Sequence, residues 1–308
     1  MLTGDLASQI GRSIFMSNLC VDCGFRKSNP LKKSLPIELR RCDFCGLVFQ
    51  SGWSETFPEY RYSYYSERME WPADELYSVA NHQRVIELLR HLRPMVGGRR
   101  VLDVGCGTGG FVRSASDAGW AALGIELSPA AVELCHKHGI QAKLLSIFDS
   151  ALDAEKFDLI VMSELIEHVP HPTEFLRRAN ELLSEGGAIY LTTPNWGSLS
   201  RRLLEGEWRA IDPEHLSYFT PRTLRSAAGR AELSVQSIRT VNASGAVFRT
   251  LFRKPLDPEE GRLADQRLRA KMDVSNSRRV AKRVANRVLS ATGLGETIKA
   301  VLTSTPPI

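Results

Sequence analysis

The chain has 308 residues, a formal net charge of +5 and a hydrophobic fraction of 43%, which is ordinary for a globular protein with one large and one small domain. It contains no run of 18 apolar residues, so we expect no transmembrane helix. The N-terminus does not resemble a secretory signal, so we expect a cytoplasmic protein. The whole positive excess lies between Glu259 and Ile308, which contains ten Lys/Arg against five Asp/Glu. We interpret this basic segment as a helix face exposed to solvent. The alternative is that it binds nucleic acid or an anionic membrane surface.

Four of the six cysteines form two C-x-x-C-G pairs, at residues 20–24 and 42–46. Without a secretion signal, this spacing indicates metal binding rather than disulfides. The glycine after each pair permits the tight turn that points backbone amides at the thiolates. Four thiolates suit structural zinc and leave no open coordination position. After an N-terminal extension of residues 1–19, we predict a zinc module over residues 20–50, with these ligands: Cys20, Cys23, Cys42 and Cys45.

Residues 51–80 form a connecting segment that is dense in aromatic side chains. The rings are Trp53, Phe57, Tyr60, Tyr62, Tyr64, Tyr65, Trp71 and Tyr77. They suit either the wall of an acceptor cleft or packing between the zinc module and the following domain.

From residue 81 onward, apolar strands alternate with amphipathic helices. A helix near 81–92 precedes predicted strands at 99–105, 120–127, 141–145, 157–164, 188–194 and 233–241. The helices between the first five strands imply right-handed crossovers and a parallel, doubly wound α/β sheet. We predict one domain over 81–308. It includes a helical insertion at about 244–292 and a last strand at about 296–305. Within the insertion, Val280, Val284 and Val288 recur every four residues among basic side chains, which predicts an amphipathic basic helix.

The stretch "VLDVGCGTGGF", residues 101–111, is a glycine loop directly after the first strand. Gly105, Gly107 and Gly110 fit the dinucleotide pattern G-x-G-x-x-G, and Glu126 follows at the expected distance. Asp103, however, stands beside the loop, where its charge would repel a pyrophosphate. The amino group and sulfonium of S-adenosylmethionine are cationic and suit this carboxylate. We therefore predict S-adenosylmethionine as the cofactor.

The segments "VLDVGCGTGGF", "FDLIVMSELIEHVPHP", "LLSEGGAIYLTTPN" and "HLSYFTPRTL" occur in this order between about residues 81 and 240. As a series they resemble class I S-adenosylmethionine-dependent methyltransferases. The similar branch includes ubiquinone-pathway O-methyltransferases and polysaccharide-cluster enzymes. The resemblance implies a seven-stranded Rossmann-like sheet in the order 3-2-1-4-5-7-6, with the last strand antiparallel.

The resemblance also implies which residues bind the cofactor. They are Asp103, Gly105, Cys106, Gly107, Thr108, Gly109, Glu126, Leu127, Ser146, Ile147 and Ser163. Glu126 would hold the ribose hydroxyls and Leu127 would pack on the adenine. The family often has an Asp after the third strand, where this chain has Ser146 and Ile147. A backbone amide or Asp149 would then bind the adenine amine.

Methyl transfer to a hydroxyl requires positioning and removal of a proton. His215, in "IDPEHLSYFT" after the fifth strand, is the predicted general base, and Glu214 would orient it or bind the acceptor. A structural role for His215 is the alternative. A helix containing Leu199, Leu203 and Leu204 suits a lid or, at most, weak membrane contact.

We therefore expect an enzyme that methylates a small-molecule acceptor, mainly a hydroxyl of a sugar or related metabolite in polysaccharide or natural-product biosynthesis. One alternative is a sugar C-methyltransferase, because similar zinc-containing enzymes pair four cysteines with a Glu-His couple. Another is an RNA-modifying methyltransferase that uses the zinc module and the basic helix. A third is an inactive scaffold, which an intact glycine loop and Glu126 disfavour.

Overall fold

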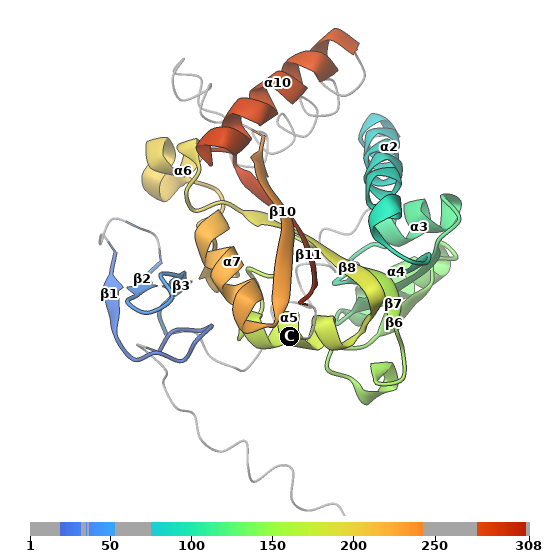
Figure 1. Ribbon diagram of the computed structural model, residues 1–308, viewed down its shortest axis with the longest axis horizontal. Coiled ribbons are helices and arrows are strands. Elements are labelled where there is room, and N and C mark those ends of the chain that lie inside the picture. Colours follow the sequence, from blue (N-terminus) through green and yellow to red (C-terminus); the bar gives the residue numbers. More distant parts are fainter. Residues whose placement is uncertain (1–18, 32–34, 36, 53–74, 243–275, 306–308) are drawn as a thin grey trace, which may run out of the picture.

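The computed structural model describes residues 19–31, 35, 37–52, 75–242 and 276–305. Its centre is a seven-stranded sheet with helices on both faces, and a smaller four-stranded sheet lies beside it (Figure 1). The aromatic segment over 53–74 and most of the predicted insertion, 243–275, fall outside the described residues. No helix in the described part is long and apolar enough to cross a membrane.

The large sheet has the predicted order. Its strands are β4 (Arg100–Val104), β5 (Ala121–Glu126), β6 (Ala142–Leu144), β7 (Phe157–Ser163), β8 (Leu183–Pro194), β10 (Leu233–Val241) and β11 (Thr297–Ser304). They run β10-β11-β8-β7-β4-β5-β6 across the sheet. Across the sheet, each pair of neighbours in the series β6, β5, β4, β7 and β8 is parallel, whereas β11 is antiparallel to both β8 and β10. In strand numbers this is 3-2-1-4-5-7-6, so the predicted topology is confirmed.

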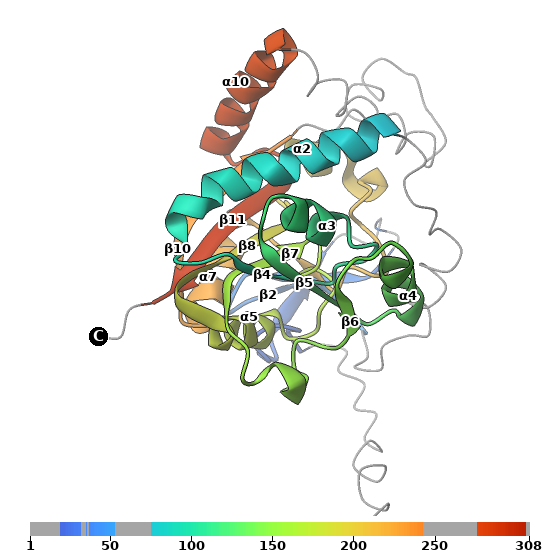
Figure 2. The same cartoon turned by 90° about the vertical axis from the view of Figure 1, so that its right-hand side faces the viewer.

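The central strands are apolar on both sides because each face carries helices (Figure 2). Val101 and Leu159 join a core cluster with the helix α2, whereas their neighbours Leu102 and Ile160 face the opposite cluster. The helices are α2 (Glu75–Leu92), α3 (Gly110–Asp117), α4 (Pro129–Lys137), α5 (Pro172–Glu181), α6 (Leu199–Leu204), α7 (Pro221–Arg230) and α10 (Asn276–Thr292). Three single turns complete them: η1 (Arg93–Met95), η2 (Ser150–Leu152) and η3 (Glu205–Glu207).

Two predicted amphipathic helices are present as α6 and α10. In α6, Leu204 is buried, while Leu199 and Leu203 remain exposed. In α10, which packs beside β10, Val284 and Val288 are more than half exposed. Their apolar stripe is therefore not buried against the described part of the chain.

The predicted zinc module shares its sheet with a segment of the large domain. Strands β1 (Ser28–Pro30), β2 (Leu39–Cys42) and β3 (Val48–Gln50) are joined by β9 (Ser217–Tyr218), which lies between α6 and α7 in sequence. Val48 pairs with Tyr218 and Phe49 with Ser217. The smaller sheet therefore extends across the boundary predicted at residue 50.

Asp22, between the first two cysteines, fastens the module to the large domain. Its side chain is 1% exposed, forms an ion pair with Arg230, and accepts a hydrogen bond from the Thr173 amide at 2.9 Å. Nearby, the His171 amide donates to the Val21 carbonyl at 3.1 Å. Cys20 and Cys42 belong to the main hydrophobic core, so the knuckles are built into the domain.

Candidate active site

The four predicted metal ligands come together. The Sγ atoms of Cys20 and Cys45 are 3.6 Å apart, as are those of Cys23 and Cys42, and all four lie within 4.8 Å of one another. Four thiolates around a tetrahedral zinc ion at 2.3 Å are separated by about 3.8 Å, so the cluster fits a structural zinc. Gly24 and Gly46 follow the knuckles with φ of 66° and 74°, the left-handed conformation that the turns require.

The glycine loop joins β4 to α3. Gly105, Gly107 and Gly109 all have positive φ, whereas Gly110 does not and begins the helix. A Cβ on Gly109 would lie 2.8 Å from Ile140 Cγ2, while one on Gly110 would meet nothing within 4 Å. The backbone therefore requires glycine at position 109 and not at position 110, which agrees with the spacing D-x-G-x-G-x-G that the methyltransferase resemblance implies.

Glu126, at the end of β5, holds the loop in place. One carboxylate oxygen accepts from the Gly107 amide at 3.0 Å, and the other accepts from the amides of Leu127 at 2.7 Å and Ser128 at 3.0 Å. A carboxylate fixed by three amides is pre-organised to accept further donors, such as the two hydroxyls of a ribose.

Asp103 lies at the end of β4 and is 4% exposed. Burial, together with the adjacent charge of Glu126, raises the pKa of Asp103 to about 8. A nearby cation reverses such a shift, whereas a pyrophosphate would increase it. The pair Asp103–Glu126 therefore fits a cationic cofactor.

The remaining predicted cofactor residues divide into two groups. Thr108 is partly buried, Ser163 is exposed at the end of β7, and Leu127 is 43% exposed beside the loop. Leu144, which pairs with Glu126 across the strands, is also exposed. Leu127 and Leu144 are thus two exposed apolar side chains close to Glu126, and Leu144 was not among the predicted residues.

Other side chains are turned away from this surface. The side chain of Ile147 is 1% exposed and belongs to the core, so any contact of this residue with the cofactor would come from its backbone. The Cys106 side chain packs into an apolar cluster with Cys135 beneath the loop. Ser146 Oγ accepts from the Phe148 amide at 3.3 Å, and Asp149 caps the turn η2.

The predicted base lies in a second cluster, beyond the end of β7. Glu167 and His168 follow this strand, and His215 comes from the loop before β9; one ligand atom of each lies within 4.8 Å of the others. The two imidazole rings meet edge to face with centroids 4.5 Å apart. Of these three residues, only His215 was predicted from the sequence as a site residue.

Hydrogen bonds orient both imidazoles. His215 Nδ1 lies 2.8 Å from the Ala210 carbonyl and His168 Nδ1 lies 3.1 Å from the Glu214 carbonyl. Since a carbonyl only accepts, each Nδ1 is the donor in its hydrogen bond. Burial lowers the pKa of His215, which keeps it neutral near pH 7. The Ala210 carbonyl accepts the hydrogen bond from His215 Nδ1 and so orients this ring.

Glu167 is 1% exposed, and neither carboxylate oxygen has a hydrogen-bond partner in the described structure. Burial, followed by the charge of Glu164, raises the pKa of Glu167 well above its usual range. The Thr193 hydroxyl is close enough to oppose this pKa shift weakly, but it forms no hydrogen bond with either oxygen. The site thus contains a buried acidic group without a polar partner.

The zinc module holds the loop that contains His215 and leads into β9. The Ser217 amide donates to the Glu167 carbonyl at 3.0 Å, and the Gln50 amide donates to the Leu216 carbonyl at 3.0 Å. Strand β9 therefore connects the metal-bearing hairpin to the His215 loop. The positions of Glu167 and His215 depend on this pairing.

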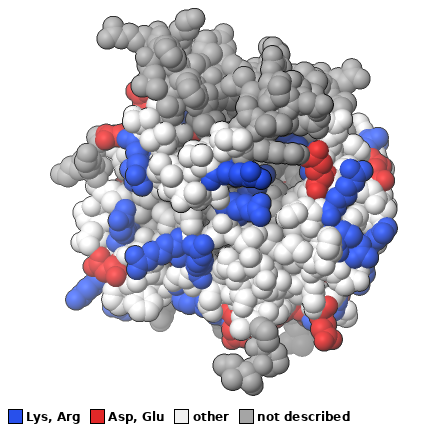
Figure 3. All heavy atoms as spheres, turned by 45° about the horizontal axis from the view of Figure 1, so that its top comes forward, with Lys and Arg blue, Asp and Glu red and all other residues white. Residues whose placement is uncertain are grey.

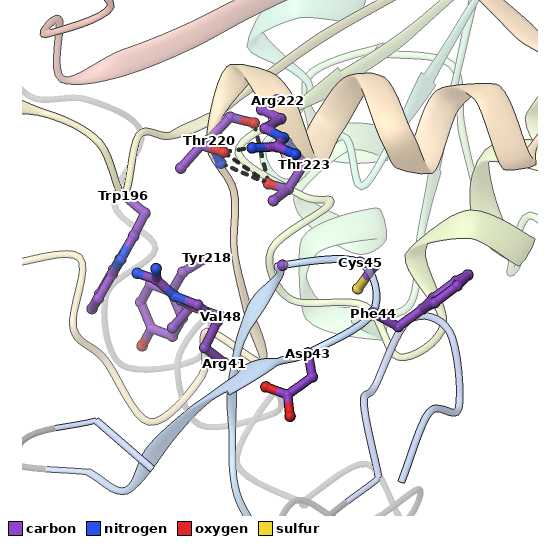
Figure 4. Close-up of a pocket in the computed structure, with 11 residues that line it drawn as sticks. Arg41, Asp43, Phe44, Cys45, Val48, Trp196, Tyr218, Thr220, Arg222 and Thr223 are labelled. Atoms are coloured by element: carbon purple, nitrogen blue, oxygen red, sulfur yellow. Dashed lines mark hydrogen bonds between the residues drawn. The ribbon is translucent and has the colours of Figure 1, made fainter. Parts of the chain in front are cut away.

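A pocket of about 300 Å³ opens between the second knuckle and the start of α7 (Figure 4). Arg41 and Arg222 line it together with the rings of Trp196 and Tyr218. The Tyr218 ring also lies 6.1 Å from His215. This pocket is therefore adjacent to the Glu167–His168–His215 cluster.

The sheet order and the glycine loop are those expected of a methyltransferase, and the comparison with protein families agrees. Residues 77–238, more than half of the chain, match the family model described as "Methyltransferase domain", so the chain belongs to this family. The predicted family membership is confirmed.

The chain is 33% identical over 109 residues to a ubiquinone biosynthesis O-methyltransferase of Haemophilus ducreyi (32% of this chain, 46% of that protein). It is 36% identical over 107 residues to that of Xanthomonas oryzae pv. oryzae (32% and 45%). The chain spans about half the length of these relatives. Among solved structures, a SAM-dependent methyltransferase from Archaeoglobus fulgidus is 19% identical, with a TM-score of 0.49 over 72% of this chain and 93% of that one.

Proposed function

We propose that this protein transfers the methyl group of S-adenosylmethionine to a hydroxyl of a small molecule. One observation carries the proposal: two complementary sites share one edge of the sheet. A cation-seeking pair, Asp103 and Glu126, borders the glycine loop after β4, and the neighbouring strand β7 leads to the cluster with His215. A sulfonium and an acceptor oxygen can therefore be placed side by side.

In this reaction the acceptor oxygen forms a bond to the methyl carbon as the carbon–sulfur bond breaks. The electron pair of that bond stays on sulfur, giving S-adenosylhomocysteine. The hydroxyl proton has to leave, and the cluster around His215 is the part of the site that handles it. The lowered pKa of His215 keeps its ring neutral, and because Nδ1 donates to the Ala210 carbonyl, Nε2 is the nitrogen that can accept this proton.

The adjacent pocket supports a sugar or related hydroxylated metabolite as the acceptor. Arg41 and Arg222 line it and can bind an acidic substituent, whereas the Trp196 and Tyr218 rings are buried and form its apolar wall. RNA is less well supported. On the face in Figure 3, groups of Lys and Arg are separated by uncharged surface rather than joined in a stripe.

The test combines calorimetry with an acceptor screen. We expect one S-adenosylmethionine per chain and methylation of hydroxylated metabolites, with mass spectrometry and NMR distinguishing O-methylation from C-methylation. His215→Ala should largely abolish turnover and retain cofactor binding, while the exposed His91→Ala should leave both unchanged. No cofactor binding would refute the proposal, and full activity of His215→Ala would remove this residue from the acceptor chemistry.

A further inference from the structure

We propose that the pocket beside the second cysteine knuckle binds a phosphoryl group between Arg41 and Arg222, and that this group belongs to the acceptor, which is a phosphorylated small molecule. The second half of this inference rests on the proposed function, whereas binding of the anion does not. The arginines of the pocket, a backbone amide and the position beside His215 carry the inference.

Two arginines line the pocket from two different elements (Figure 4). Arg41 lies in β2, and Arg222 lies in the first turn of α7. Neither guanidinium has a hydrogen-bond or ion-pair partner among the described residues. Small-molecule sites in proteins have volumes of about 300–1,000 Å³, and this pocket measures about 300 Å³. Two unpartnered cations facing such a cavity suit an anionic group of a small ligand.

A third arginine adds to the positive charge. Arg201 lies over the Trp196 ring, with Cζ 4.2 Å from the ring centroid, and Trp196 forms a wall of the pocket. Burial, followed by the charges of Arg202 and Arg41, lowers the pKa of Arg201. Glu205 opposes this shift and contributes least. Positive charges therefore repel one another at this place, and an anion in the pocket would relieve the repulsion.

The negative groups of the lining are engaged elsewhere. Asp43 is the one carboxylate among the described lining residues, and its Oδ1 accepts from Asn29 Nδ2 at 2.5 Å. In Figure 4 this carboxylate points away from Arg222 and Thr220. The Cys45 sulfur lies within 4.8 Å of the other three cysteine sulfurs, where a zinc ion would bind it. Both arginines are therefore left for a ligand.

The first turn of α7 offers a backbone donor to the same pocket. The Thr223 amide donates to Thr220 Oγ1 at 3.2 Å, the Thr220 amide donates to Thr223 Oγ1 at 2.9 Å, and Pro221 has no amide hydrogen. This leaves the Arg222 amide without a partner in the described part of the chain. An amide at a helix N-terminus adds to the attraction that the arginines exert on a phosphate.

A phosphoryl group fits these donors better than a carboxylate. One guanidinium can bond both oxygens of a carboxylate, so a carboxylate would occupy only one of the two arginines. A phosphoryl group has three terminal oxygens and a charge of about −1.5 to −2 near pH 7. It can therefore accept from Arg41, from the Arg222 guanidinium and from the Arg222 amide at the same time.

The pocket is placed to hold one end of the acceptor. The Tyr218 ring lines the pocket and lies 6.1 Å from the His215 ring. A phosphoryl group between the arginines and a hydroxyl beside His215 can therefore belong to one small molecule. Arg41 and Arg222 would bind and orient this molecule without taking its proton.

The experiment is a titration of the zinc-loaded full chain with inorganic phosphate at fixed ionic strength, followed by phosphorus NMR. We expect saturable binding, and at least tenfold weaker binding for Arg41→Gln and for Arg222→Gln. Arg225→Gln is the matched control, because Arg225 is exposed on the same helix and does not line the pocket. It should bind phosphate like the wild type. Acetate should displace phosphate at least tenfold less effectively than phosphate binds.

Zinc content and calorimetry with S-adenosylmethionine check that each variant is intact, and since Arg41 and Arg222 are exposed, both variants should fold. If the wild type shows no saturable phosphate binding, if both variants bind it unchanged, or if Arg225→Gln weakens it equally, the inference is overturned.

The acceptor role is tested by turnover. With phosphorylated acceptors, Arg222→Gln should raise KM more than it lowers kcat. Methylation of unphosphorylated acceptors alone would overturn the inference and leave the proposed function intact. Phosphate binding without methylation of any hydroxylated acceptor would contradict the proposed function instead.

Discussion

The contact between Asp22 and Arg230 offers a direct test of how the zinc module is attached. The Asp22 carboxylate is 1% exposed, pairs with an arginine whose side chain is 26% exposed, and accepts a hydrogen bond from the Thr173 amide. The substitution Asp22→Asn keeps the shape of the side chain and one acceptor oxygen. It removes the charge and turns an amide group toward the guanidinium.

The magnitude follows from the burial of the two partners. Removing one partner of a buried ion pair costs about 3–5 kcal/mol. Since solvent reaches part of Arg230, and the hydrogen bond from Thr173 survives, we expect a loss of about 2–3 kcal/mol in the free energy of unfolding. For a chain of this size that corresponds to a decrease in the melting temperature of about 4–10 °C.

The assay is thermal and urea unfolding in the presence of zinc, with zinc content measured by mass spectrometry. Asp43→Asn is the matched control, because Asp43 occupies the other knuckle and its carboxylate hydrogen-bonds Asn29 at the surface. The control should change stability by less than about 0.5 kcal/mol. If Asp22→Asn behaves like Asp43→Asn, then the ion pair does not fasten the module. The double variant with Arg230→Met should lose less than the sum of the single variants.

Three further predictions concern the cofactor loop and the thiolates. Gly109→Ala should destabilise the fold by about 2–4 kcal/mol and weaken cofactor binding, because the added Cβ would lie 2.8 Å from Ile140 and the residue has a φ of 75°. Gly110→Ala is the control. Thermal unfolding and calorimetry with S-adenosylmethionine should show no change for it. Because the pKa of Asp103 is about 8 without a cationic partner, S-adenosylmethionine affinity measured by calorimetry should fall by up to about tenfold per unit as pH decreases below 8. Asp103→Asn should bind weakly with a flat pH profile, and a flat profile in the wild type would contradict the assignment. Cys42→Ser should lose zinc and soluble yield, and normal stability without metal would count against a structural site.

The pH dependence of Asp103 has a defined sign for stability as well. Its pKa in the folded protein lies above the usual value of 3.8, so the folded state binds more protons than the unfolded state between about pH 4 and 8. The contribution of Asp103 to stability therefore decreases as pH rises through this window. Bound S-adenosylmethionine should reduce this dependence.

Sequence patterns predicted the parts of the molecule in which neighbouring residues specify the structure. The alternation of apolar strands with helices of 10–15 residues gave the doubly wound sheet, and β11 was placed correctly as a late strand. The spacing of the four cysteines predicted their cluster, because each C-x-x-C pair is formed within one tight turn. Asp103 identified the cofactor class from charge alone. In each case, period, spacing or turn chemistry carries the information.

Burial along a single segment was harder to predict. The sequence placed Ile147 at the adenine because it follows the third strand, but packing turns this side chain into the core and leaves Leu144 exposed instead. Over a short strand and the loop after it, the direction of a side chain depends on the neighbouring layers, and the pattern has too few residues to fix it.

The cluster that we propose as the acceptor site could be recognised only from the tertiary structure. Glu167 and His168 meet His215 across almost fifty residues of sequence, through a loop held by the pairing of β9 with β3 and by the Ser217 amide. No local pattern encodes this meeting, since a cluster of side chains from separate loops forms only when the sheet edge and the zinc module are both in place. The sequence by itself determined the sheet, the four cysteines and the charge of the cofactor. The folded chain decided which side chains gather around His215, because that depends on distances between segments far apart along the chain.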